Sequence, residues 1–289
     1  MSVHLAAIPL PTRACYNESD MVYGLVDTHA HLNDDALWDD RVSVLARSRA
    51  AGLCGVLCVG CDALTSERAL ELSACDPMVV PAVGIHPTNI LQASVADFES
   101  VERWASMPQV AAIGETGLDF YWESTPHERQ REVFQWHLDL ARRLGLPVTV
   151  HSRNAEDAVL EELRLIPPPG GVLHCFGGAR DVASRALDMG LYIGVDGPVT
   201  YKKSCDLQDL VRWLPLDRML VETDSPYLSP HPFRGKLNDP SRLLLIVEKI
   251  AELRKITSQE VARATTNNAF HLFPRLASRI RVSRSIPEE

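Results

Sequence analysis

The chain has 289 residues, of which 46% are hydrophobic, and carries a formal net charge of −9 at neutral pH. This length suffices for a sizeable core in one or two domains, and a barrel of alternating strands and helices takes about 250 residues as a single domain. The acidic balance argues against a protein that holds nucleic acid through a broad basic surface. It does not exclude a nuclease whose bound metal ions supply the positive charge.

The seven cysteines are scattered without a disulfide-like spacing and indicate reduced intracellular thiols. Cys58 and Cys61 form a single Cys-x-x-Cys pair at the end of an apolar run, which we interpret as buried thiols rather than a zinc or redox site. No apolar stretch approaches the ~18–20 residues that cross a bilayer, and the first residues lack the pattern of a signal peptide. We therefore expect a cytoplasmic protein without membrane association and without an obligate protein partner.

In chain order, residues 1–20 show no sustained period and predict an arm before the domain. Short apolar runs typical of strands then alternate with segments of helical spacing. The predicted strands are Leu25–Asp27, Gly55–Val59, Val79–Gly84, Val110–Gly114, Pro147–Val150, Gly171–Leu173, Leu191–Val195 and Arg218–Val221. The predicted helices are Ala36–Ala51, Ser66–Ala74, Val95–Ala105, His127–Leu144, Ala155–Leu165, Ala179–Met189, Cys205–Trp213, Ser241–Leu253 and Ser258–Phe270.

Eight strand and helix units in alternation predict an α/β fold, a single (β/α)8 TIM barrel over residues 21–274. The last stretch, from Arg279 to Glu289, is short, polar and basic in its first half, and we predict a flexible tail over residues 275–289. A doubly wound open sheet is the alternative architecture. It is disfavoured because no Gly-x-Gly-x-x-Gly turn follows the first strand.

The first predicted strand ends in two histidines one residue apart, His29 and His31. Alternate side chains of a strand share a face, so Asp27, His29 and His31 are expected to point the same way. Two neutral imidazoles side by side form a ready pair of ligands for a divalent metal ion.

Other polar side chains follow later strands at the corresponding position. In a parallel barrel the carboxyl ends of the strands build the active site, so these residues are expected to converge there. They are His86, Glu115, His151, Arg153, His174 and Asp224.

These residues lie in a series of seven ordered motifs between about Val22 and Phe273. The motifs are Asp27-Thr-His-Ala-His-Leu32, Val83-Gly-Ile-His-Pro87, Ala112-Ile-Gly-Glu-Thr-Gly-Leu-Asp-Phe-Tyr121, His151-Ser-Arg-Asn-Ala155, His174-Cys-Phe-Gly-Gly178, Glu222-Thr-Asp-Ser-Pro-Tyr-Leu228 and Arg234-Gly-Lys-Leu-Asn238. The series resembles the TatD family of metal-dependent hydrolases and deoxyribonucleases, which belongs to the amidohydrolase superfamily of barrels.

The resemblance implies a site for two divalent ions, whether magnesium, manganese or zinc. His29, His31 and Asp224 would hold one ion, His151 and His174 the other, and Glu115 would bridge the two. A carboxylate can span two cations, and two ions together can activate water and clamp both oxygens of a phosphodiester. Asp224 is the candidate for accepting the proton of that water, so Asp224 and Glu115 are the expected catalytic residues.

Three further residues are expected to contact substrate, namely His86, Arg153 and Arg234. A guanidinium matches two phosphate oxygens in geometry and charge, although Arg153 could instead form a salt bridge behind the site and Arg234 could be a solvated loop charge.

Three carboxylates near the predicted site have open roles. Asp27 and Glu222 could orient ligand histidines or form structural contacts. Asp196 stands where members of the resembled family usually carry a small residue, and it could face the site mouth, where it would repel a phosphate unless paired.

The function that the resemblance implies is 3′-to-5′ exonuclease activity on single-stranded DNA or RNA. In the alternative function, the same barrel and metal ions hydrolyse a carboxylic ester or amide instead of a phosphodiester. An aminoacyl-tRNA deacylase, or another amidohydrolase or esterase acting on a small amide or lactone, would be an example. A catalytically inactive binding module is disfavoured, because all six predicted ligands are retained.

Overall fold

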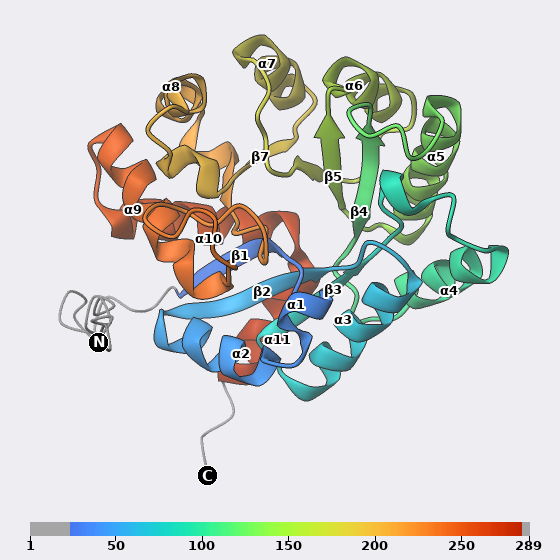
Figure 1. The fold of residues 1–289 in the computed structure, drawn as a ribbon, viewed down its shortest axis with the longest axis horizontal. Helices are drawn as coiled ribbons and strands as arrows, with labels where there is room; N and C mark the ends of the chain where they lie inside the picture. The colour runs from blue at the N-terminus through green and yellow to red at the C-terminus, as the bar shows by residue number, and fades with distance from the viewer. Residues whose placement is uncertain (1–23, 285–289) are drawn as a thin grey trace, which may run out of the picture.

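The computed structural model describes residues 24–284, and the arm predicted over residues 1–20 lies outside this range. Eight parallel strands form one sheet in which each strand pairs with the next in sequence order (Figure 1). The strands are β1 (Leu25–Ala30), β2 (Leu53–Val59), β3 (Val79–Val83), β4 (Ala112–Asp119), β5 (Val148–Arg153), β6 (Gly171–Leu173), β7 (Tyr192–Val195) and β8 (Met219–Val221). The predicted α/β barrel is therefore confirmed.

Helices pack against the strands, most of them as an outer ring (Figure 1). They are α1 (Asp35–Trp38), α2 (Arg41–Ala50), α3 (Ala63–Cys75), α4 (Val95–Ala105), α5 (His127–Leu144), α6 (Glu156–Leu165), α7 (Arg180–Asp188), α8 (Cys205–Trp213), α9 (Leu243–Arg254), α10 (Ser258–Leu272) and α11 (Pro274–Arg284). Local signals set their limits: α5 ends at Gly145, which adopts the left-handed conformation that favours glycine. None of the helices described is both long and apolar enough to cross a membrane.

The barrel is closed where the ends of β1 and β8 meet. The backbone N–H of Asp224 donates to the carbonyl oxygen of His29 over 2.9 Å, and the N–H of His31 donates to the carbonyl oxygen of Ser225 over 2.7 Å. These bonds hold the chain segments of three predicted metal ligands next to one another. Closure of the fold and assembly of the site thus depend on the same contacts.

The apolar core has two layers. The larger layer fills the space between strands and helices and includes Val56, Phe134 and Ile246. The smaller layer lies inside the barrel towards the amino ends of the strands, where Val26 and Leu57 pack with residues of the last two helices.

The prediction of a flexible tail over residues 275–289 is wrong for the part that the structure describes. The chain is helical to Arg284, and Leu276, Ala277 and Ile280 are buried. Leu276 and Ile280 belong to the apolar layer inside the barrel, and Ile280 packs so closely on Gly55 that a Cβ there would clash with it. The helix is hard to recognise in the sequence because its few apolar residues stand among several arginines. Residues 285–289 lie outside the described range.

Replacing Leu276 with alanine should lower the free energy of unfolding by about 2–5 kcal/mol, because the substitution removes a fully buried side chain and leaves a cavity. Chemical denaturation measures this change. The matched control is Val42→Ala on α2, since Val42 is 76% exposed and its loss should have little effect. Equal stability of the Leu276→Ala variant and the unmodified protein would show that α11 does not pack on the barrel.

Candidate active site

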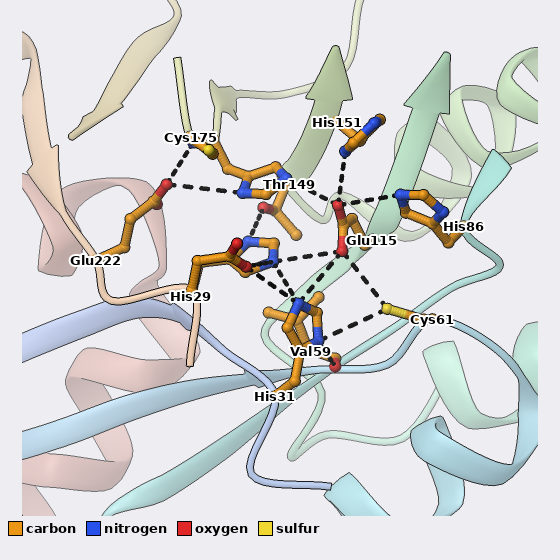
Figure 2. A network of polar contacts seen from close by, with 12 residues as sticks. His29, His31, Val59, Cys61, His86, Glu115, Thr149, His151, Cys175 and Glu222 are labelled. Atoms are coloured by element: carbon orange, nitrogen blue, oxygen red, sulfur yellow. Dashed lines mark hydrogen bonds and ion pairs between the residues drawn. The ribbon is translucent and has the colours of Figure 1, made fainter. Parts of the chain in front are cut away.

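The predicted ligands converge at the carboxyl ends of the strands, around the carboxylate of Glu115 (Figure 2). Glu115 Oε2 lies 3.4 Å from His29 Nε2 and 3.5 Å from His31 Nε2. Glu115 Oε1 faces three other ring nitrogens, His174 Nε2 at 2.8 Å, His151 Nδ1 at 3.0 Å and His86 Nε2 at 3.4 Å. One carboxylate therefore contacts two separate groups of imidazoles, one through each oxygen.

The backbone near Glu115 requires a residue without a side chain. Gly114 adopts a φ of 144°, and a Cβ at this position would lie 2.4 Å from Thr149 Cγ2 on β5. Only glycine fits where β4 approaches β5 so closely beside the cluster.

Asp224 completes the group that contains His29 and His31. Its Oδ1 lies 3.4 Å from His31 Nε2 and 3.9 Å from His29 Nε2. The residue adopts a φ of 54°, in the left-handed region, which aspartate tolerates better than most residues. This turn after β8 places the carboxylate over the mouth of the barrel rather than along the strand.

The orientation of His31 shows that the cluster fits a cation. His31 Nδ1 lies 2.9 Å from the carbonyl oxygen of Val59, which can only accept, so Nδ1 carries the hydrogen. In neutral His31 the bare Nε2 lone pair then faces His29 Nε2 at 3.2 Å and the oxygens of Glu115 and Asp224. Electron pairs facing one another repel unless a proton or metal ion lies between them.

Several sets of side chains could hold a metal ion, because each brings three ligand atoms within 4.8 Å of one another. Imidazole nitrogens and carboxylate oxygens together suit zinc or manganese, and the carboxylates also suit magnesium. The sets of nitrogen and oxygen ligands are His29, His31 and Asp224; His29, Glu115 and His174; and His86, Glu115 and His151.

The charges of the cluster follow from its burial and its ion pairs. Burial raises the pKa of Glu115, but interactions with His174, His86 and His151 outweigh this effect and hold it well below its usual value. Burial lowers the pKa of His174, but Glu115 and Glu222 outweigh it and raise the pKa well above the usual value. Protons therefore occupy the cluster where a metal ion would bind.

Metal affinity should consequently rise with pH. Burial alone would lower the pKa of both rings, but interactions with Cys61, Asp224 and Glu115 raise the pKa of His31, and interactions with Glu115 and Glu222 raise that of His174. The charged, doubly protonated form of each ring therefore competes with a metal ion for the same nitrogen. Below those pKa values, each displaced proton should raise the apparent association constant about tenfold per pH unit. Calorimetric titration with Mn²⁺ in buffers of different ionisation enthalpy counts the protons released. An affinity that does not change with pH, with no proton release, would contradict this assignment.

Two residues that the sequence reasoning missed contact the cluster. Asp119 Oδ2 lies 3.0 Å from His151 Nε2 and so orients that ring. The Cys61 thiol lies 3.5 Å from Glu115 Oε2 and 3.6 Å from His31 Nδ1. Spacing could have revealed Asp119, because it lies four residues after Glu115 on the same strand and therefore on the same face.

The two deep carboxylates differ in role. Glu222 Oε1 accepts from the N–H of Cys175 at 2.5 Å and lies 3.7 Å from His174 Nδ1, so it helps to orient a predicted ligand. Asp27 instead accepts from the N–H and the hydroxyl of Thr223, at 3.0 and 2.6 Å, and fastens β1 to the end of β8.

Asp196 lies below the mouth of the site and is buried rather than open to substrate. Its Oδ2 accepts from the Cys175 thiol at 3.2 Å. Burial, together with the nearby charges of Glu222 and Asp224, raises the pKa of Asp196 to about 8. Near pH 7 the carboxyl is therefore mostly neutral and repels a phosphate little.

The two predicted substrate arginines lie apart from the cluster and stack on tyrosines. The Arg153 guanidinium lies 3.9 Å from the ring centroid of Tyr121, and that of Arg234 lies 4.6 Å from the ring centroid of Tyr201. Both arginines are exposed, and neither forms an ion pair with a residue in 24–284. The salt bridge considered for Arg153 is therefore not found in this range.

A family model described as "TatD related DNase" matches residues 26–274, nearly all of the described chain. The chain belongs to the TatD family. The resemblance stated from the motifs is confirmed, and so is the enzyme class of a metal-dependent hydrolase.

Among TatD-family relatives, the uncharacterised metal-dependent hydrolase YcfH of Escherichia coli K12 is 40% identical over 90% of this chain and 99% of its own length. The protein named 3′-5′ ssDNA/RNA exonuclease TatD, from Salmonella typhimurium, is 37% identical over 86% of this chain and 98% of its own. The crystal structure of YJJV, a TatD homologue from Escherichia coli K12, is 31% identical and has a TM-score of 0.82, with 86% of this chain and 98% of that chain covered.

Proposed function

We propose that this protein is a deoxyribonuclease of the TatD type, which removes nucleotides from the 3′ end of single-stranded DNA or RNA with the help of two divalent ions. The observation that carries the proposal is the position of Glu115, whose two oxygens face different imidazole groups. The name of the relative from Salmonella typhimurium, a 3′-5′ ssDNA/RNA exonuclease, supports the choice of substrate.

In this proposal each ion has its own set of ligands. His29, His31 and Asp224 would hold one ion, His151 and His174 the other, and Glu115 would contribute one oxygen to each. When bound, the ions would lower the pKa of a water molecule and offset the negative charge on the phosphoryl oxygens.

Asp224 has a second role in this scheme. Interactions with His31, His174 and His29 outweigh the effect of burial and lower the pKa of Asp224, so the carboxylate is ionised and able to accept a proton near neutral pH. It would take the proton of the attacking water and pass it to the leaving oxygen.

The remaining predicted residues would bind the substrate. His86 lies beside Glu115 at the edge of the cluster, and Arg153 and Arg234 offer exposed guanidinium groups for phosphates of the same strand. With a net charge of −9 the protein offers little general attraction for a polyanion, so binding should be weak and sensitive to salt.

The test is a time course on a single-stranded DNA oligonucleotide labelled at its 5′ end, with Mg²⁺ or Mn²⁺ and with EDTA. A ladder that shortens from the 3′ end and disappears with EDTA is expected. An oligonucleotide that stays intact with both metals would refute the nuclease, and hydrolysis of a carboxylic ester or amide would then be assayed.

A further inference from the structure

Two aromatic side chains stand exposed on the turn that follows β4. Tyr121 is 51% exposed and Trp122 is 54% exposed, and their ring centroids lie 5.0 Å apart in a T-shaped arrangement. Neighbouring aromatic residues that are left open to solvent often mark a binding surface, since each ring offers a large apolar face with few degrees of freedom.

This turn is fastened to the candidate metal centre by Asp119. Asp119 Oδ1 accepts from the backbone N–H groups of both Tyr121 and Trp122 at 2.9 Å, while Oδ2 contacts His151 Nε2. Gln130 on α5 holds the backbone of Asp119 through two further hydrogen bonds, of 2.7 and 2.8 Å. The aromatic pair therefore has a fixed position relative to the site.

Arg153 adds a planar cation to the pair. Its guanidinium lies 3.9 Å from the ring centroid of Tyr121 and 5.6 Å from that of Trp122. Arg153 follows His151 by two residues on β5, so its chain segment lies next to the site, and its carbonyl oxygen accepts from the N–H of Phe120 at 2.9 Å. The stacking holds the guanidinium in place, and its N–H groups make no hydrogen bond or ion pair with residues 24–284, so within that range they can contact an anion.

A surface of two aromatic rings and one guanidinium suits a ligand that alternates flat rings with phosphates. An unpaired nucleobase can stack on such rings, whereas the base faces within a duplex are covered by their neighbours. We propose that Tyr121, Trp122 and Arg153 form a binding site for an unpaired nucleobase and its adjoining phosphate. This inference rests on the proposed nuclease function, and it explains how an acidic protein would prefer single strands.

The kinetic test compares two 5′-labelled single strands, one of thymidine nucleotides and one whose 3′-terminal nucleotides are abasic. Replacing Trp122 with alanine should raise the KM for the thymidine strand about tenfold and leave the KM for the abasic strand unchanged. The matched control is Trp122→Phe, which keeps a stacking face and should behave as the unmodified protein. An equal rise in KM for both strands, or no rise for either, would overturn the nucleobase site while leaving the nuclease function intact.

A binding measurement tests the proposed nucleobase site without catalytic turnover. Stacking on Trp122 should quench the tryptophan fluorescence when a thymidine strand with phosphorothioate linkages is added, and an abasic strand should not quench it. The Trp122→Phe variant should bind the same strand without quenching. Should the protein cleave no nucleic acid, this quenching would still support the base site, and its absence would refute it.

Discussion

Replacing Glu115 with glutamine should lower the rate of hydrolysis at least about 10³-fold and reduce the bound metal from two ions to at most one. The substitution preserves the shape of the side chain but removes its negative charge and one of its two acceptor oxygens. Both oxygens of Glu115 face imidazole nitrogens in the structure, Oε2 towards His29 and His31 and Oε1 towards His151 and His174. An amide cannot bridge two cations, because its NH₂ group only donates.

The matched control is Glu162→Gln on α6. Glu162 is also a buried carboxylate, but it pairs with Arg131 on α5 rather than with a histidine of the cluster. Elemental analysis after dialysis gives the metal content, and steady-state kinetics give the rate. If Glu115→Gln kept two ions and a rate within tenfold of the unmodified protein, Glu115 could not be the shared ligand.

Replacing Asp224 with asparagine should lower kcat by about 10²- to 10⁴-fold with a smaller effect on metal content. Asparagine retains an oxygen where Asp224 Oδ1 faces His31 at 3.4 Å, so a weakened ligand remains. It cannot accept the proton of the attacking water, and this loss acts on the chemical step. The expected result is therefore a low rate at saturating metal and substrate.

Asp239→Asn serves as the control for Asp224. Asp239 is likewise a buried carboxylate on the chain that follows β8, but it pairs with Arg47 and caps a short helix rather than facing the histidines. The rate of this variant should stay close to that of the unmodified protein. A rate for Asp224→Asn that recovered fully at high Mn²⁺ would mean that Asp224 acts only as a ligand.

The barrel could be predicted because its strands and helices alternate with clear periodicity and because the site residues stand at or just after the ends of the apolar runs. His29, Glu115, His151 and Asp224 are close in space for a topological reason, since all parallel strands end at the same rim. The apolar run that predicts the fourth strand ends at Gly114, whereas β4 continues to Asp119. Asp119 orients His151 and holds the aromatic turn, and its spacing from Glu115 indicates a shared face only once the strand is known to reach that far.

The end of the chain shows a second limit of structure prediction from the sequence. Phe273, Leu276, Ala277 and Ile280 are buried and follow the i, i+3, i+4, i+7 spacing of one helix face. That stretch is short and stands among several arginines, so the polar residues hide the spacing in the sequence. The sequence predicts the same role, a buried thiol, for Cys58 and Cys61, but the structure places the two side chains in different surroundings. Cys58 lies in the core, while Cys61 contacts His31 and Glu115.

The claim that Glu115 joins two metal ions is tested most directly by crystals of the protein grown with Mn²⁺ and measured at the manganese absorption edge. Two anomalous peaks about 3.5–4 Å apart are expected, one near His29, His31 and Asp224 and one near His151 and His174, with Glu115 between them. A single peak, or peaks that Glu115 does not touch, would contradict it.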